Sequence, residues 1–112
     1  MNNRAFGKAG ENMAAEILQL QGYRILKRNY RCRMGEIDIV ASKNNAITFF
    51  EIKTRTGCEY GKPAEAVNFR KQNRIRKSAE CYLQEVERMG FRPEKITFDV
   101  LEIEVNHIKE AF

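Results

Sequence analysis

Histidine, cysteine and long apolar runs are all scarce in this chain, and each scarcity removes a class of function. The single histidine is His107, so a Ser-His-Asp catalytic arrangement would have to pass through a residue near the C-terminus. The three cysteines, Cys32, Cys58 and Cys81, lie far apart with no C-x-x-C spacing, which indicates neither a zinc site nor a disulfide framework. Reduced thiols in a cytoplasmic protein are therefore expected. No glycine-rich phosphate loop is present either.

The chain also lacks the segments that target or anchor proteins in membranes. No apolar run approaches the roughly 18 residues that a transmembrane helix needs, and residues 1–8 lack the apolar stretch of a signal peptide. No repeat, low-complexity tract or linker interrupts the 112 residues, a length that suits one domain with one modest core. We therefore expect a single domain, residues 1–112, without a membrane partner.

What the chain has in excess is positive charge. Its formal net charge of +5 favours an anionic partner such as nucleic acid, although charge alone does not demand one. The pattern of apolar residues and of turn residues predicts the element order α-β-β-β-α-β, with Gly22 ending the first helix and Asn68 capping the second. The predicted elements are a helix over 4–21, strands over 23–31, 36–41 and 47–53, a loop over 55–63, a helix over 69–89 and a strand over 96–105. This order is typical of an α/β or α+β arrangement in which helices flank a mixed sheet.

Charged residues interrupt two of the predicted strands. Glu51 and Lys53 follow the strand-like run 46–50, and because side chains alternate along a strand they share one face. Asp38 stands in the preceding strand, which a hairpin around residues 43–45 joins to the next one. We therefore expect Asp38, Glu51 and Lys53 to meet on one sheet face. Two carboxylates and an ammonium in that arrangement suit a Mg²⁺-dependent phosphodiesterase, with the backbone carbonyl of Ile52 as a further ligand.

Each of these residues also has a structural interpretation. For Asp38 taken alone, an edge strand that turns this side chain to water is the better explanation, because an acidic residue inside a buried strand is disfavoured. Glu51 and Lys53 are explained by an exposed charge pair, which contributes little stability. The combination in two neighbouring strands favours the functional interpretation.

Glu11 is a candidate site residue on the first helix. It lies on the same helical stripe as Ala14, Ala15 and Leu18, so its carboxylate faces inward and requires a metal or a cation as partner. A carboxylate at the rim of the first helical turns, where the helix dipole favours it, is an equally good account.

Basic residues gather at the start of the second helix. Arg70, Arg74 and Lys77 follow one another at spacings that place them on one helix face, and such a stripe suits phosphate binding. A generic solvated helix face is the alternative. The residues predicted to contact nucleic acid are Arg31, Arg33, Arg55, Arg70, Lys71, Gln72, Arg74 and Lys77.

Taken together, these motifs resemble a small bacterial protein family. The motifs are Gly10-Glu11, residues 22–26, 29–31, 35–38 and 50–55, Ala66-Val67, Lys71-Gln72, residues 98–100 and the closing Ala111-Phe112. They are similar to those of the YraN-like family, which is placed by similarity in the PD-(D/E)xK nuclease superfamily, near archaeal Holliday-junction resolvases. The resemblance spans nearly the whole chain, although Ile37 stands where the superfamily name has a proline.

The resemblance implies a fold, a site and an activity. The fold is a restriction-endonuclease-like α/β core with a central mixed sheet between helices. Asp38 fills the first carboxylate position, Glu51 and Lys53 fill the E-x-K motif, and Glu11 fills the helix carboxylate. The implied function is a Mg²⁺- or Mn²⁺-dependent endonuclease that hydrolyses DNA, including branched DNA, with a homodimer as the expected assembly. The alternatives are a non-catalytic nucleic-acid-binding module and a protein-interaction domain on the same fold.

Overall fold

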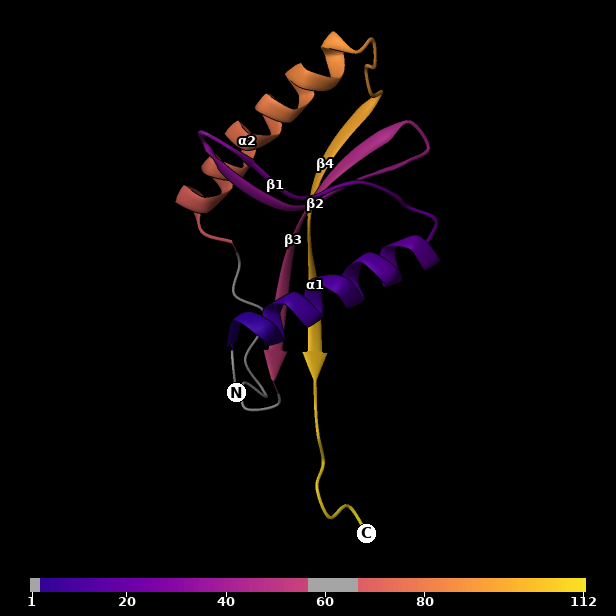
Figure 1. Cartoon of the computed structure of the whole chain (residues 1–112), viewed down its shortest axis with the longest axis vertical. Coiled ribbons are helices and arrows are strands. Elements are labelled where there is room, and N and C mark those ends of the chain that lie inside the picture. The colour runs from indigo at the N-terminus through magenta and orange to yellow at the C-terminus, as the bar shows by residue number, and fades with distance from the viewer. Residues whose placement is uncertain (1–2, 57–66) are drawn as a thin grey trace.

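The protein is described here by a computed structural model that covers residues 3–56 and 67–112, and its elements follow the order α-β-β-β-α-β predicted from the sequence (Figure 1). The elements are α1 (Asn3–Leu20), β1 (Arg24–Cys32), β2 (Gly35–Lys43), β3 (Ala46–Thr56), α2 (Phe69–Arg88) and β4 (Lys95–Val105). β3 runs on to Thr56, so the prediction of a loop from residue 55 was wrong at its start. The rest of that loop, with Cys58, lies outside the described residues.

The helix ends confirm the capping residues expected from the sequence. At the end of α1, Gly22 has a φ of 94°, the N–H of Tyr23 donates to the carbonyl of Leu18 at 2.9 Å, and the N–H of Gly22 donates to that of Gln19 at 3.0 Å. This pair of hydrogen bonds requires a residue in the left-handed conformation, which glycine adopts without a steric penalty. At the start of α2, Asn68 Oδ1 accepts from the N–H of Lys71 at 2.8 Å.

The four strands form one mixed sheet in the order β1-β2-β3-β4. The first three are antiparallel, and Asn44 and Asn45 make the β2–β3 turn with φ values of 51° and 63°, the conformation of a two-residue type I′ hairpin. β4 pairs parallel to β3, because α2 carries the chain back to the opposite end of the sheet. The predicted α/β class with a mixed sheet flanked by helices is confirmed.

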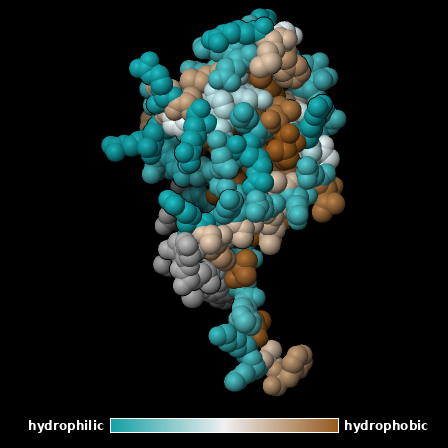
Figure 2. Space-filling model, in the orientation of Figure 1, coloured by the Kyte–Doolittle hydropathy of each residue, from teal (hydrophilic) through white to brown (hydrophobic). Residues whose placement is uncertain are grey.

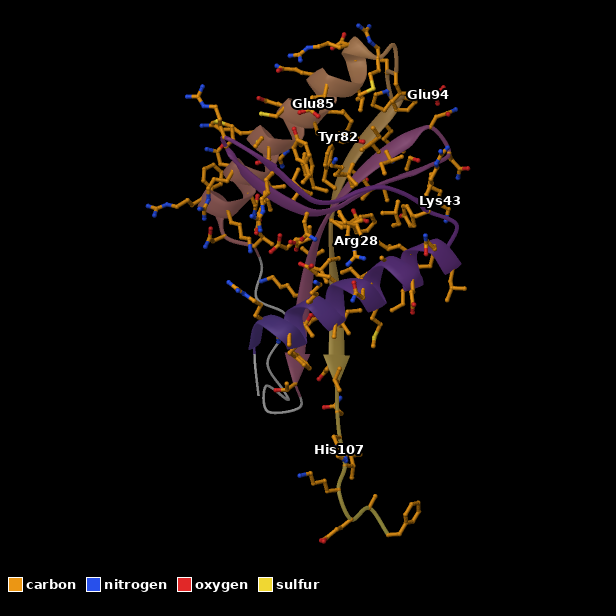
Figure 3. All side chains as sticks on the ribbon, viewed as in Figure 1. Arg28, Lys43, Tyr82, Glu85, Glu94 and His107 are labelled. Atoms are coloured by element: carbon orange, nitrogen blue, oxygen red, sulfur yellow. The ribbon has the colours of Figure 1, made fainter. Side chains whose placement is uncertain are left out.

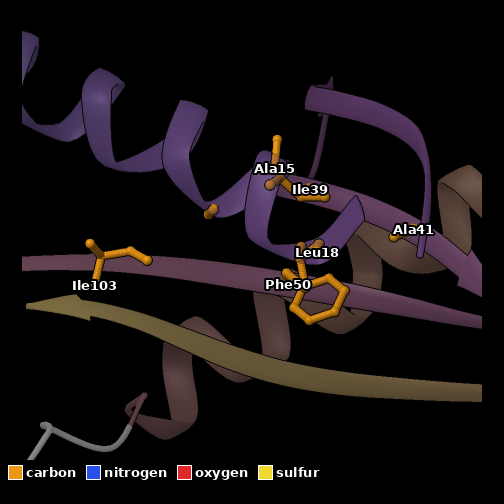
Figure 4. Packing of buried hydrophobic residues seen from close by; sticks show 7 residues of the cluster. Ala15, Leu18, Ile39, Ala41, Phe50 and Ile103 are labelled. Atoms are coloured by element: carbon orange, nitrogen blue, oxygen red, sulfur yellow. The ribbon is translucent and has the colours of Figure 1, made fainter. Parts of the chain in front are cut away.

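Each of the two described helices covers one face of the sheet (Figure 1), so the molecule has two apolar clusters. On the α1 face, Leu18 belongs to a cluster with Ile39, Ala41, Phe50 and Ile103, and it lies beside Phe50 in Figure 4. The α2-side cluster consists of Tyr30, Ile37, Val40, Ile47, Phe49, Ala79 and Tyr82. Tyr82 and Glu85 of α2 lie on this side (Figure 3), where the Tyr30 hydroxyl donates to Glu85 Oε1 at 2.9 Å.

The side chains of β2 do not alternate strictly between the two faces. Ile37 belongs to the α2-side cluster and Ile39 to the α1-side cluster, although they are two residues apart. The partner strand explains the change, because Asn29 has a φ of 51° between the paired residues Arg28 and Tyr30. A left-handed residue inside a strand rotates the residues after it to the other face. The alternation of side chains along β2 is therefore interrupted at Asp38, which lies opposite Asn29.

The outer surface is largely polar on the face shown in Figure 2, and the segment after β4 extends away from the body of the molecule. His107 lies on this segment, far from the sheet (Figure 3). Among the described helices, none combines the length and the apolar character that crossing a lipid bilayer requires.

Candidate active site at the open end of the β2–β3 hairpin

The candidate site begins where the β2–β3 ladder stops. The last paired residues are Ile39 and Phe50, and beyond them the strands separate. Asp38 replaces the missing backbone contact with its side chain, because the N–H of Ile52 donates to Asp38 Oδ2 at 2.8 Å. This bond anchors the Asp38 carboxylate at the opening between the two strands.

A polar cleft of about 480 Å³ lies at this opening. It is bordered by α1 on one side and by the second half of β3 on the other. Its lining residues are Phe6, Gly7, Glu11, Asp38, Glu51, Ile52, Thr54 and Thr56. Three of the four residues predicted to be catalytic, Glu11, Asp38 and Glu51, therefore face one cavity.

Glu11 reaches this cleft because α1 approaches β3 very closely one residue earlier. Gly10 is buried, and a Cβ atom at this position would lie 2.1 Å from Thr54 Oγ1. Only glycine permits such a contact between a helix and a strand. The Gly10-Glu11 pair thus combines a packing residue with a carboxylate directed at the site.

The other two carboxylates of the cleft, Glu51 and Glu11, act on the electrostatic environment of Asp38. The pKa of Asp38 is raised to about 7, chiefly by burial and also by the negative charges of Glu51 and Glu11, although the Ile52 N–H and the Lys71 ammonium act to lower it. The positive groups near this carboxyl group do not offset its burial and the two neighbouring negative charges. Such a group is a good candidate for a functional site.

Glu51 forms an ion pair that sequence reasoning did not anticipate. Lys71 Nζ, in the first turn of α2, contacts Glu51 Oε1, and the Glu51 side chain is only 12% exposed. Lys71 was predicted to bind nucleic acid; its ammonium contacts Glu51, a residue that lines the acidic cleft, and the contact with nucleic acid stays a prediction. The sequence did contain one signal for this contact. Asn68 caps α2 and so fixes where the helix begins, and Lys71 lies three residues after it, in the first turn.

Lys53 lies two residues after Glu51 in β3 and is half-buried. It is not among the residues that line the acidic cleft, and it makes interactions of its own. Asp38 and Glu51, two of the three residues expected to meet on one face, both line the acidic cleft. The role of Lys53 in positioning water stays a prediction.

The described carboxylates of the acidic cleft do not by themselves enclose a metal ion, but they match what a small divalent cation such as Mg²⁺ usually takes from a protein. Within residues 3–56 and 67–112, no three His, Cys, Asp or Glu side chains converge closely enough to enclose a metal ion. Mg²⁺, however, usually takes one or two carboxylates and fills its other positions with water and phosphate oxygens. Asp38 and Glu51, on adjacent strands at the mouth of the cleft, meet that lesser requirement, and Glu11 borders the same space.

A second cleft, of about 340 Å³, lies on the α2 side of β3. Its lining residues are Phe49, Glu51, Val67, Gln72, Ile75, Arg76, Phe98, Asp99 and Val100. Glu51 lines both cavities, so the two clefts adjoin at this residue. Asp99 interrupts its strand in the sequence, and the structure places it, exposed, at this second cleft.

Apart from Lys71 and Arg55, the residues predicted to contact nucleic acid are all exposed. Arg33, Arg70, Arg74 and Lys77 are exposed, and so is Arg31, which pairs with Glu36 at 3.2 Å. Gln72 lines the second cleft and its Nε2 donates to the carbonyl of Val67 at 2.7 Å.

Arg55 does not belong to the exposed basic surface. Its side chain is 11% exposed, and its Nε lies 2.7 Å from Glu102 Oε1 of β4. Because β4 runs parallel to β3, Arg55 and Glu104 are register partners and Glu102 is within reach. The prediction that Arg55 presents itself to nucleic acid is thus not supported by its position.

A mixed sheet between two helices, with carboxylates at the open end of a hairpin, is consistent with a nuclease-like core. By sequence comparison, the chain belongs to the uncharacterised protein family UPF0102, whose model matches residues 10–103. This confirms the resemblance to the YraN-like family.

Relatives match over almost the full length of the chain. A UPF0102 protein of Clostridium botulinum strain 657 is 44% identical over 110 residues, covering 98% of this chain and 88% of the relative. One from Caldanaerobacter subterraneus subsp. tengcongensis is 39% identical over 122 residues, covering 100% and 98%. One from Dictyoglomus turgidum is 45% identical over 103 residues, covering 92% and 85%.

Proposed function

We propose that this protein is a metal-dependent endonuclease that hydrolyses phosphodiester bonds in DNA. The observation that carries the proposal is the acidic cleft, where Asp38 and Glu51 of adjacent strands and Glu11 of α1 border one polar cavity. Exposed arginine and lysine side chains on α2, the helix whose Lys71 contacts Glu51, supply attraction for a phosphate backbone.

The side chains present can be given distinct tasks. Mg²⁺ or Mn²⁺, when bound, supplies a Lewis acid and neutralises charge that develops at phosphorus. The Ile52 N–H holds the Asp38 carboxylate at the cleft, and the helix-to-strand contact at Gly10 holds Glu11 there. Lys53 positions the attacking water, and Lys71, which contacts Glu51, is placed to turn to a substrate phosphate.

A titration with Mn²⁺ followed by calorimetry tests the binding half of this proposal. The wild type is expected to take up the ion, and the Asp38→Asn, Glu51→Gln double variant is expected to take up none while keeping the circular dichroism of the wild type. Asp99→Asn is the matched control, because Asp99 is exposed and does not line the acidic cleft. No uptake by the wild type would count against metal-dependent catalysis.

A cleavage screen tests the catalytic half. Linear duplex, flap, splayed-arm and four-way-junction DNA are incubated with Mg²⁺ or Mn²⁺ and the wild type, beside Lys53→Ala. We expect cleavage of at least one substrate by the wild type and a loss of about 10²-fold or more in Lys53→Ala, as for removal of one electrostatic group at an active site. Equal cleavage by both proteins would remove Lys53 from the mechanism.

The Lys71–Glu51 ion pair also favours a second candidate function, a non-catalytic nucleic-acid-binding module. An ammonium that satisfies Glu51 lessens the need for a metal. This function predicts DNA binding that weakens steeply with salt and is unchanged by chelation of divalent ions. Binding that requires Mn²⁺ would contradict it.

A further inference from the structure

We propose that the second cleft, on the α2 side of Glu51, holds one unpaired base of the substrate. The preferred substrates are then DNA structures with single-stranded nucleotides beside the scissile phosphate, rather than continuous duplex. This inference rests on the proposed endonuclease function and goes on to name the substrate class of the same site.

The two clefts together match the two chemical halves of a nucleotide. The acidic cleft is polar and fits a phosphate with its counter-cation, whereas the second cleft has apolar walls formed by Phe49, Ile75 and Phe98. Because Glu51 lines both cavities, a ligand in one lies next to a ligand in the other. A nucleotide with its phosphate at Asp38 and its base on the α2 side of β3 would span this junction.

The wall of the second cleft is an aromatic platform. Phe98 is 39% exposed and stacks on the buried Phe49, with ring centroids 5.4 Å apart and an angle of 24° between the planes. The guanidinium of Arg76 lies 5.0 Å from the Phe98 ring centroid. Aromatic rings and arginine planes are the surfaces on which proteins stack unpaired bases.

Polar groups at the rim of this cleft suit the edges of a base. Arg76 carries donors, Asp99 carries acceptors, and the amide of Gln72 carries both kinds of group. A volume of about 340 Å³ is at the lower end of ligand pockets and suits one base better than a base pair or a peptide segment.

Continuous duplex is a poor fit to such a cleft. A paired base has to be unstacked and extruded before it can enter, which costs a few kcal/mol, and the cost is least for a base that is already single-stranded. Flaps, splayed arms and junction centres present such bases next to a phosphate.

The test removes one base from the DNA and, separately, changes the side chains that would stack on that base. Affinity is measured in EDTA for splayed-arm DNA and for copies in which one of the first three unpaired nucleotides of each arm is abasic. We expect the wild type to lose about 5-fold or more in affinity at one position, as expected for one stacked base. Phe98→Leu and Arg76→Gln should bind the intact and the abasic DNA alike.

Arg74→Gln is the matched control, because Arg74 is exposed on the same helix and does not line the cleft. It should weaken binding to every substrate and keep the discrimination against the abasic copy. Equal binding of intact and abasic DNA by the wild type at every position would overturn the base site, and so would discrimination that persists in both Phe98→Leu and Arg76→Gln.

Parallel cleavage assays with Mn²⁺ separate this inference from the proposed function. If the wild type cleaves intact and abasic substrates at the same rate and binds them alike, the endonuclease stands and the base site fails. If it discriminates in binding and cleaves neither, the base site stands and the endonuclease fails.

Discussion

Lys71 at the start of α2 forms an ion pair with Glu51 at the open end of the β2–β3 hairpin. This contact joins the basic helix to the acidic cleft, although 20 positions separate the two residues in the numbering (71 against 51) and the intervening residues 57–66 lie outside the described structure. It implies that a cation bound at Glu51 competes with an ammonium that is already there.

Replacing Lys71 by methionine should therefore strengthen metal binding. Without the competing ammonium, we expect Lys71→Met to bind Mn²⁺ about threefold to tenfold more tightly than the wild type, the equivalent of a partly exposed ion pair. The melting temperature should be lower without metal and should rise more when Mn²⁺ is added. Lys77→Met, an exposed residue of the same helix, should behave as the wild type. Weaker Mn²⁺ binding by Lys71→Met would mean that Lys71 supports the site instead of competing for it.

The raised pKa of Asp38 should appear in the dependence of stability on pH. Its pKa is about 7 in the folded chain, because of burial and of the charges of Glu51 and Glu11, and about 4 when unfolded. The folded state thus binds more protons between these values, so the free energy of unfolding from this group falls as pH rises from about 4 to about 7 and is level above. In EDTA, Asp38→Asn should flatten this fall and raise the melting temperature at pH 8.

The control for that experiment is Asp99→Asn, since Asp99 is exposed at the other cleft. It should leave the pH dependence of unfolding as it is in the wild type. An Asp38→Asn variant that is less stable than the wild type at pH 8 would show that the carboxylate, with its bond to the Ile52 N–H, stabilises the fold.

Gly10 should be intolerant of even the smallest side chain. An added Cβ would meet Thr54 Oγ1 at 2.1 Å and Thr54 Cβ and Cγ2 at 3.0 Å, so α1 has to move away from β3. We expect Gly10→Ala to lower the free energy of unfolding by about 1–3 kcal/mol, measured by urea denaturation. A Cβ atom added at Gly7 would have no atom within 4 Å, so Gly7→Ala should be neutral or should stabilise the fold by up to about 1 kcal/mol. Adding Thr54→Ala to Gly10→Ala should recover most of the loss, and no recovery would exclude this contact as its cause.

Arg55 should contribute mainly to stability, whereas Arg33 should contribute mainly to DNA binding. Arg55 is mostly buried against Glu102, so Arg55→Gln leaves a half-buried carboxylate with one partner fewer and should cost about 1–3 kcal/mol of stability. Arg33 is exposed, and Arg33→Gln should change stability by less than about 0.5 kcal/mol while it weakens DNA binding. Urea denaturation and a binding titration on both variants check this. A fully stable Arg55→Gln protein with weakened DNA binding would restore the original prediction for Arg55.

The sequence by itself determined the order of the elements and the residues that cap the helices. The apolar stripes of the helices, Gly22 and Asn68 at the caps and Asn44-Asn45 in the hairpin act through contacts a few residues apart, so local chemistry was enough to place them. The charges inside the strands also identified Asp38 and Glu51 as residues that face one cavity. Their placement followed from the short hairpin that joins β2 to β3.

Only the tertiary structure decided which side chains surround those carboxylates. Four features join segments that are separate in the chain: the left-handed Asn29 of β1 opposite Asp38 of β2, the ion pair of Lys71 with Glu51, the burial of Arg55 against Glu102, and the passage of α1 over Thr54. Such contacts depend on the order of the strands, on the angle at which each helix crosses the sheet and on local twist. The spacing of residues along the sequence specifies none of these. For the same reason, the sequence did not predict the cleft beside Phe98, which is lined by residues of α2 and of the parallel strands β3 and β4.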